Sequence, residues 1–210
     1  VGLMTELPWK PVVYLPTNLT VRLDAEVFQL EDLTLWCEGK AVDLLGSGVK
    51  RRQVHRLAGT LMRYIEGVKA IKGRGLPTVA ALFFWPDFST QRASAEVYLV
   101  SADHIGGPIT PDRARELIGL NEDSLGEIEA SATVVPVGQA LRAHQFRKLW
   151  GALAPHNVME EVSWFLWPES SSTAVIMTVS WLEPAFSQAG IQIADDMARN
   201  FRVEPLDRAR

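Results

Sequence analysis

The 210-residue chain has a single cysteine, Cys37. One cysteine cannot form an intramolecular disulfide or a cysteine-cluster metal site, so neither can stabilise this fold. Long hydrophobic runs are missing as well, because no apolar stretch approaches the ~20 residues that a membrane-spanning helix needs. We therefore expect no membrane span, and the scarcity of cysteine indicates a reducing compartment such as the cytoplasm.

An excess of basic charge is also absent. The sequence has 21 Lys and Arg against 25 Asp and Glu, which gives a formal net charge of −4. Nucleic-acid-binding proteins need a basic surface to neutralise phosphates, so we expect no nucleic-acid partner. The N-terminus shows no basic segment followed by an apolar one, as a secretory signal would have. We expect a cytoplasmic protein, exported only if the terminus at Val1 is a processed one.

The composition does provide for a core. Hydrophobic residues make up 47% of the chain and charged residues 22%, values typical of a globular protein. No segment has the composition of a linker or a low-complexity tract. Residues 1–210 are therefore predicted to form one α/β domain.

Two segments share one pattern, in which an apolar strand, a Trp-Pro-acid turn and a second strand follow one another. The turns are Trp-Pro-Asp at residues 85–87 and Trp-Pro-Glu at residues 167–169. Proline cannot continue a strand ladder, so each segment predicts an antiparallel hairpin. A weak internal repeat of residues 50–136 and 139–205 is one explanation, and repeated wiring of a single antiparallel sheet is the other.

Hydrophobic periodicity predicts the remaining elements. Apolar residues at i, i+3, i+4 and i+7 steps over residues 50–71 indicate a helix lying on a core. A strand is expected at residues 78–85, where positions 79–85 are all apolar, as in a strand covered on both faces. Thr110 as N-cap and Pro111 begin a short helix. A helix with one apolar face is also expected near the C-terminus, its stripe formed by Phe186, Gly190, Ile193, Ala194, Met197 and Phe201.

The strands are less evenly marked. Residues 29–49 are mixed, and the apolar residues of 139–149 fit neither the helix nor the strand period. Strands are expected at residues 11–15, 19–23, 94–100, 126–136, 158–167 and 173–182, and a short strand or tail at 202–205.

Three runs of the C-terminal half resemble the second half of the PsbP-like fold. They are residues 136–142, the strand pair 162–167 and 175–182, and the ending 193–203. The fold is shared by an extrinsic subunit of photosystem II, a Ran-binding nuclear-import factor and many small bacterial proteins. Asn200 stands where the family pattern usually has Ser.

The resemblance covers mainly residues 126–203 and implies an α+β fold, a mainly antiparallel sheet flanked by helices in a PsbP-like sandwich. It also implies that residues 139–149 form a strand. Proteins of this fold mostly bind other proteins, and no catalytic residue can be transferred from them.

The residues themselves show no catalytic, cofactor-binding or metal-binding constellation. No two of the four histidines have the spacing of metal ligands. Asp103 and His104 could act as an acid–base pair, but no nucleophile accompanies them. Cys37 is expected to be a small core residue. Neighbouring carboxylates at Glu160 and Glu161 point to opposite faces of a strand, so they cannot form a dyad.

Two groups of residues are candidates for binding a partner. The polar side of the helix at 50–71 carries the basic residues Lys50, Arg51, Arg52, Arg56 and Arg63, suited to an acidic partner or simply solvated. Arg51, Arg52 and Arg56, called the basic strip below, are the candidates for binding. Trp164 and Trp167 are either packed or, if they lie on opposite sides of the turn, one of them is exposed as a binding hot spot.

These observations favour a non-enzymatic accessory or protein-interaction module of bacterial origin, with no cofactor and with another protein as its partner. A small-molecule-binding protein or enzyme with a cleft between sheet and helices is the alternative. A subunit of an envelope or secretion assembly is a third hypothesis. The open edges of an antiparallel sheet would also allow a homodimer.

Overall fold

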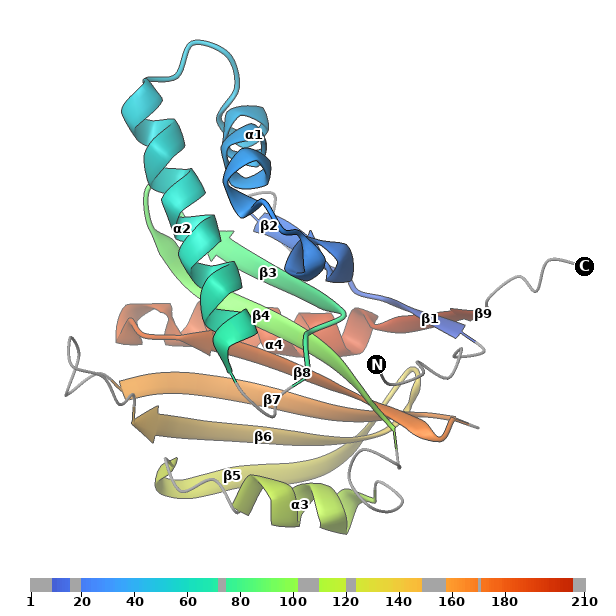
Figure 1. Ribbon diagram of the computed structural model, residues 1–210. Helices are drawn as coiled ribbons and strands as arrows, with labels where there is room; N and C mark the ends of the chain where they lie inside the picture. The colour runs from blue at the N-terminus through green and yellow to red at the C-terminus, as the bar shows by residue number, and fades with distance from the viewer. Residues whose placement is uncertain are drawn as a thin grey trace, which may run out of the picture.

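The computed structural model describes residues 9–15, 20–71, 75–101, 110–119, 124–148, 158–169 and 171–205. Its strands are β1 (Trp9–Val12), β2 (Thr20–Asp24), β3 (Val79–Phe84), β4 (Gln91–Ser101), β5 (Ser124–Val135), β6 (Gly138–Lys148), β7 (Val158–Pro168), β8 (Thr173–Trp181) and β9 (Arg202–Pro205). Seven of them form an antiparallel sheet in the order β2-β3-β4-β8-β7-β6-β5, and β1 pairs with β9 beside it (Figure 1). The expected mainly antiparallel α+β fold is confirmed.

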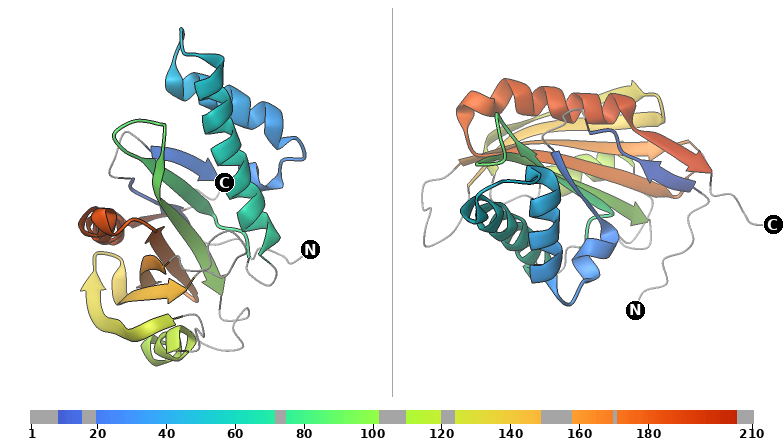
Figure 2. Two further views of the ribbon diagram at one scale, coloured as in Figure 1. Left: turned by 90° about the vertical axis from the view of Figure 1, so that its left-hand side faces the viewer. Right: turned by 90° about the horizontal axis from the view of Figure 1, so that it is seen from above.

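Helices cover both faces of the large sheet (Figure 2). α4 (Ser187–Asn200) packs on one face, while α2 (Arg51–Ala70) and α3 (Pro111–Gly119) lie on the other. α1 (Leu33–Leu45) packs against α2. None of the described helices is both long and apolar enough to cross a membrane.

β3 shows why this sheet needs cover on both sides. All six of its residues are buried, as the unbroken apolar run predicts. Ala80, Leu82 and Phe84 face α2, and the alternate residues join the core beneath α4. Cys37 is fully buried between α1 and α2, where burial and the nearby Glu66 raise the pKa of its thiol to about 11. It is the core residue that we expected.

Element boundaries agree with the periodicity where the period is strong. The helix expected at residues 50–71 is α2, and the strand that the resemblance implied at 139–149 is β6. α1 was not predicted, because exposed apolar residues interrupt its polar face and leave no clear stripe. Its start carries a local signal, since Asp32 accepts hydrogen bonds from the backbone N–H groups of Thr34 and Leu35.

α4 packs tightly against the sheet at Gly190. A Cβ atom there would lie 2.5 Å from the ring of Trp181, which is held in place by a 2.9 Å hydrogen bond from its indole N–H to Glu160. We expect Gly190→Ala to lower the free energy of unfolding by about 1–3 kcal/mol, although alanine is the better helix former.

Urea unfolding followed by circular dichroism measures this effect. Gly67→Ala in α2 is the control, because a Cβ at Gly67 would meet no atom within 4 Å. This control should stabilise the protein by roughly 0.5–1 kcal/mol. Equal stabilisation by both substitutions would show that α4 does not pack as described.

Candidate functional site

Among the tryptophans in the described part of the chain, the exposed one is Trp85. Its side chain is 64% exposed, because β3 ends at Phe84 and Trp85 already belongs to the following turn. Trp164 is only 5% exposed, faces α4, and donates an indole hydrogen bond to Asp195 at 3.2 Å, so it offers no surface to a partner. Trp167 is half-buried in the small core beneath α3. The sequence analysis considered an exposed, binding tryptophan in the second hairpin, at Trp164 or Trp167. In the structure the exposed tryptophan is instead Trp85, in the first hairpin.

An apolar pocket of about 290 Å³ lies beside Trp85. Its walls come from the end of β3, the 3₁₀ helix η3 (Pro184–Phe186) and the first turns of α4. The lining contains no charged side chain. An exposed tryptophan at the rim of an apolar pocket is typical of interface hot spots. The lining residues are Phe83, Phe84, Trp85, Ala185, Phe186, Ala189 and Ile193.

The turn formed by residues 85–89, called the Trp85 turn below, is held on both sides. The Arg92 guanidinium donates to the carbonyl oxygen of Trp85 at 3.0 Å and pairs with Glu183. The carboxylate of Asp87 accepts the backbone N–H of Ser89 at 2.7 Å. Hydrogen bonds from Ser89, with the Arg92 and Arg56 charges, hold the pKa of Asp87 below its ordinary value. A turn fixed in this way loses little conformational freedom on binding.

The basic strip of Arg51, Arg52 and Arg56 lies next to the same turn. All three side chains are exposed on the first two turns of α2. A second, smaller pocket of about 100 Å³ joins the two regions, with walls from both α2 and the turn. The basic strip and the Trp85 turn are therefore neighbours at one end of the molecule, and neither Trp164 nor Trp167 lines this pocket. The smaller pocket is lined by Leu45, Gln53, Arg56, Asp87, Phe88 and Ser89.

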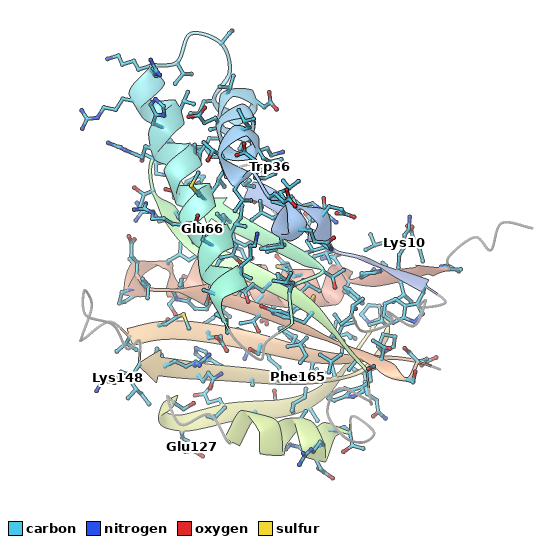
Figure 3. The ribbon with its side chains drawn as sticks, viewed as in Figure 1. Lys10, Trp36, Glu66, Glu127, Lys148 and Phe165 are labelled. Carbon is cyan, nitrogen blue, oxygen red and sulfur yellow. The ribbon has the colours of Figure 1, made fainter. Side chains whose placement is uncertain are left out.

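The arginines lie at the N-terminal end of α2, where positive charges interact unfavourably with the helix dipole. Lys50, the N-cap of α2, makes no side-chain capping hydrogen bond, and the first turn has no acidic residue. Unpaired N–H groups and the helix dipole make this terminus positive, so added cations destabilise it. In Figure 3 the nitrogen-tipped side chains at this end of α2 project away from the sheet. An anionic group of a partner would relieve this accumulation of positive charge.

His55 lies within the basic strip as an exposed residue. It accepts a hydrogen bond from the Arg51 side chain at 3.1 Å, and its other ring nitrogen lies 3.6 Å from Glu38. Asp103, His104 and His156 lie outside the described residues.

A buried polar cluster surrounds Glu160, and no local sequence pattern indicates it. The Glu160 carboxylate accepts from the Trp181 indole at 2.9 Å and from the Ser187 hydroxyl at 2.7 Å. His144 Nε2 lies 2.9 Å from the same carboxylate. The cluster joins three strands to the start of α4, which forms one wall of the Trp85 pocket.

Glu161 points to the opposite face, as expected, where it accepts from Gln145 at 2.9 Å and from Ser163 at 3.1 Å. Within the described ranges no group of three His, Cys, Asp or Glu side chains could hold a metal ion.

An antiparallel sheet with helices on both faces is the class of fold that these residues define. Among solved structures, the chain resembles LpqN, involved in cell envelope biogenesis of Mycobacterium tuberculosis, at 10% identity and a TM-score of 0.49, covering 96% of this chain and 88% of that one. It also resembles the Saccharomyces cerevisiae Ran-binding protein Mog1p at 13% identity and a TM-score of 0.37, covering 61% of this chain and 81% of that one.

The sequence indicated a PsbP-like fold, and these two likenesses concern the fold alone. At these identities and TM-scores, what either protein binds says nothing about this chain. No protein-family model and no curated protein matches the sequence.

Proposed function

We propose that this chain is a non-enzymatic accessory module that binds another protein at the Trp85 turn. The observation that carries the proposal is a tryptophan 64% exposed on a fixed turn, beside an apolar pocket. An indole left in water at the rim of such a pocket gains most when a partner covers both. A reducing, cytoplasmic setting belongs to the same proposal.

The adjacent charge defines the partner further. Arg52 forms no ion pair with a described residue, whereas the charge of Arg56 acts on Asp87 of the Trp85 turn, and both arginines lie on a protein whose net charge is negative. The partner segment therefore carries an apolar or aromatic anchor for the pocket and acidic residues for the start of α2. Such charges contribute mainly to the association rate and to specificity.

A small-molecule-binding protein or enzyme is the weaker alternative. The pocket volume of about 290 Å³ lies at the lower limit of ligand sites, which span roughly 300–1,000 Å³. Ligand sites also need a few convergent polar groups, and its lining contains no titratable side chain. No lining residue can act as acid, base or nucleophile, so this pocket fits an anchor side chain better than a reaction.

We expect Arg52→Glu to raise the stability of the protein while it weakens binding to an acidic partner. An acidic residue in the first turn of α2 favours the helix dipole, so we expect the free energy of unfolding to rise by roughly 0.5–1.5 kcal/mol. Affinity for an acidic segment should fall at the same time. Arg63→Glu is the matched control, with the same change of charge in the middle of α2. Loss of stability in Arg52→Glu, or unchanged binding, would contradict the argument.

Peptide display on the full chain tests the proposal. We expect wild-type protein to enrich peptides with an apolar anchor flanked by Asp or Glu, and the Trp85→Ala variant to enrich none of them. Affinity capture from lysate, compared with an Arg51→Glu, Arg52→Glu, Arg56→Glu variant, then identifies the natural partner. Enrichment of the same peptides by wild type and Trp85→Ala would overturn the proposal.

A further inference from the structure

β5 is an unusually open edge strand. It ends the large sheet, and β6 is its only strand partner in the described part of the chain. The six residues 129–134 are all exposed, so both faces of the strand are in water here, and Val134 is 77% exposed. Figure 3 shows Glu127 on the same strand at the outer side of the sheet.

An open edge presents unpaired backbone N–H and C=O groups that pair readily with another strand. Proteins usually protect such edges with lysine, proline, a bulge or a covering segment. β5 has a register shift between Leu125 and Glu129, with Gly126 at φ +79°, which protects only its first half. From Glu129 to Val135 the pairing with β6 is regular, and the segment contains no Lys or Pro.

We propose that β5 pairs antiparallel with β5 of a second copy of this chain, so that the two seven-stranded sheets become continuous across a twofold axis. The axis passes through the segment 129–134, called the edge segment below. This assembly is independent of the Trp85 turn, which lies at the end of β3.

The edge segment is complementary to itself, as a twofold interface requires. Its sequence is Glu-Ala-Ser-Ala-Thr-Val, so its central side chains are small and allow two sheets to meet without steric conflict. Its only charge, Glu129, is at one end, and antiparallel pairing about the centre keeps the two carboxylates apart. Pairing also satisfies the unpaired backbone groups of both copies at once.

A foreign extended peptide fits this edge less well. Strand addition of a peptide gains its specificity from pockets that receive alternate side chains. Along the edge segment both faces are exposed, and neither described pocket has a wall there. A second copy needs no such pocket, because the backbone pairing itself is symmetric.

Sedimentation velocity of the full chain over a range of concentrations gives the first readout. We expect a concentration-dependent dimer that is lost in Ala132→Pro, since proline has no N–H to donate. Trp85→Ala should dimerise like wild type, which keeps this result separate from the proposed function. The proposal would be overturned if the protein stays monomeric at all concentrations up to about 100 times a dissociation constant in the micromolar range.

Cysteine scanning gives a readout that does not depend on a disruptive substitution. Ala130→Cys, Ser131→Cys, Ala132→Cys and Thr133→Cys are made singly, and the native Cys37 is buried with its thiol pKa raised to about 11, so background oxidation is low. One residue of the edge segment lies on the twofold axis, directly opposite the same residue of the second copy. Only at this position do the two Cβ atoms of identical residues come within disulfide distance. Arg22→Cys on the opposite edge strand, β2, is the control.

We expect one position of the scan to form a covalent dimer on mild oxidation and its neighbours to form much less. Equal cross-linking at all four positions, or as much at Arg22→Cys, would overturn the pairing.

Discussion

Replacing Glu160 with alanine is expected to lower the free energy of unfolding by about 3–5 kcal/mol. The carboxylate is buried on β7 and bonded to Trp181, Ser187 and His144. Its removal leaves buried donors without an acceptor, and each unsatisfied donor destabilises the folded state by its full desolvation penalty. Glu160→Gln retains an acceptor oxygen, so its free energy of unfolding should lie between those of wild type and Glu160→Ala.

Glu129→Ala is the matched control for this prediction. Glu129 lies 3.7 Å from the other ring nitrogen of His144, but its side chain is largely exposed. An exposed pair contributes little, so the change should stay within about 0.5 kcal/mol. Urea unfolding measures all three variants. If Glu160→Ala and Glu129→Ala unfold at the same midpoint, the cluster does not hold α4 on the sheet.

Trp85→Ala is expected to weaken partner binding at least ~30-fold, which corresponds to the ~2 kcal/mol that defines a hot spot. Stability should change by less than about 0.5 kcal/mol, because the side chain is mostly in water. Removal of the indole takes away an exposed apolar surface at the rim of the pocket.

Two further variants distinguish this effect from a general loss of hydrophobic surface. Ala189→Trp places a large side chain in the pocket wall without removing Trp85, and it should also block binding. Tyr14→Ala removes another aromatic residue that is 48% exposed. Tyr14 follows β1, which pairs with β9 beyond the C-terminal end of α4, whereas the pocket lies at its N-terminal end. Binding by Tyr14→Ala should equal that of wild type.

The fold could be predicted in elements whose buried positions produce a clear pattern of apolar residues. α2 has a single apolar stripe, and β3 is apolar throughout because helices cover both faces of the sheet at that point. β6 is harder to predict, because it carries Gln139, Arg142 and His144 among apolar residues, and the resemblance was needed to assign it. α1 lacks a stripe since it packs mainly on α2.

The site was predicted only in part, because it depends on where strands end and on which residues pair across neighbouring strands. The basic strip is visible as a run of arginines on one helix. Which tryptophan is exposed depends on where each strand ends: β3 ends before Trp85, whereas β7 continues through Trp167 to Pro168. The contact of His144 with Glu160 joins residues on neighbouring strands, so it depends on a pairing that no local pattern reveals.

The most direct test of the account is calorimetric titration of one display-selected peptide, with an apolar anchor and acidic flanks, into four forms of the full chain. These are wild type, Trp85→Ala, Arg52→Glu and Tyr14→Ala. We expect saturable binding to wild type and Tyr14→Ala, at least ~30-fold weaker binding to Trp85→Ala, and weaker, less salt-dependent binding to Arg52→Glu. Equal dissociation constants for Trp85→Ala and Tyr14→Ala would contradict it, because the Trp85 turn would then not be the docking site.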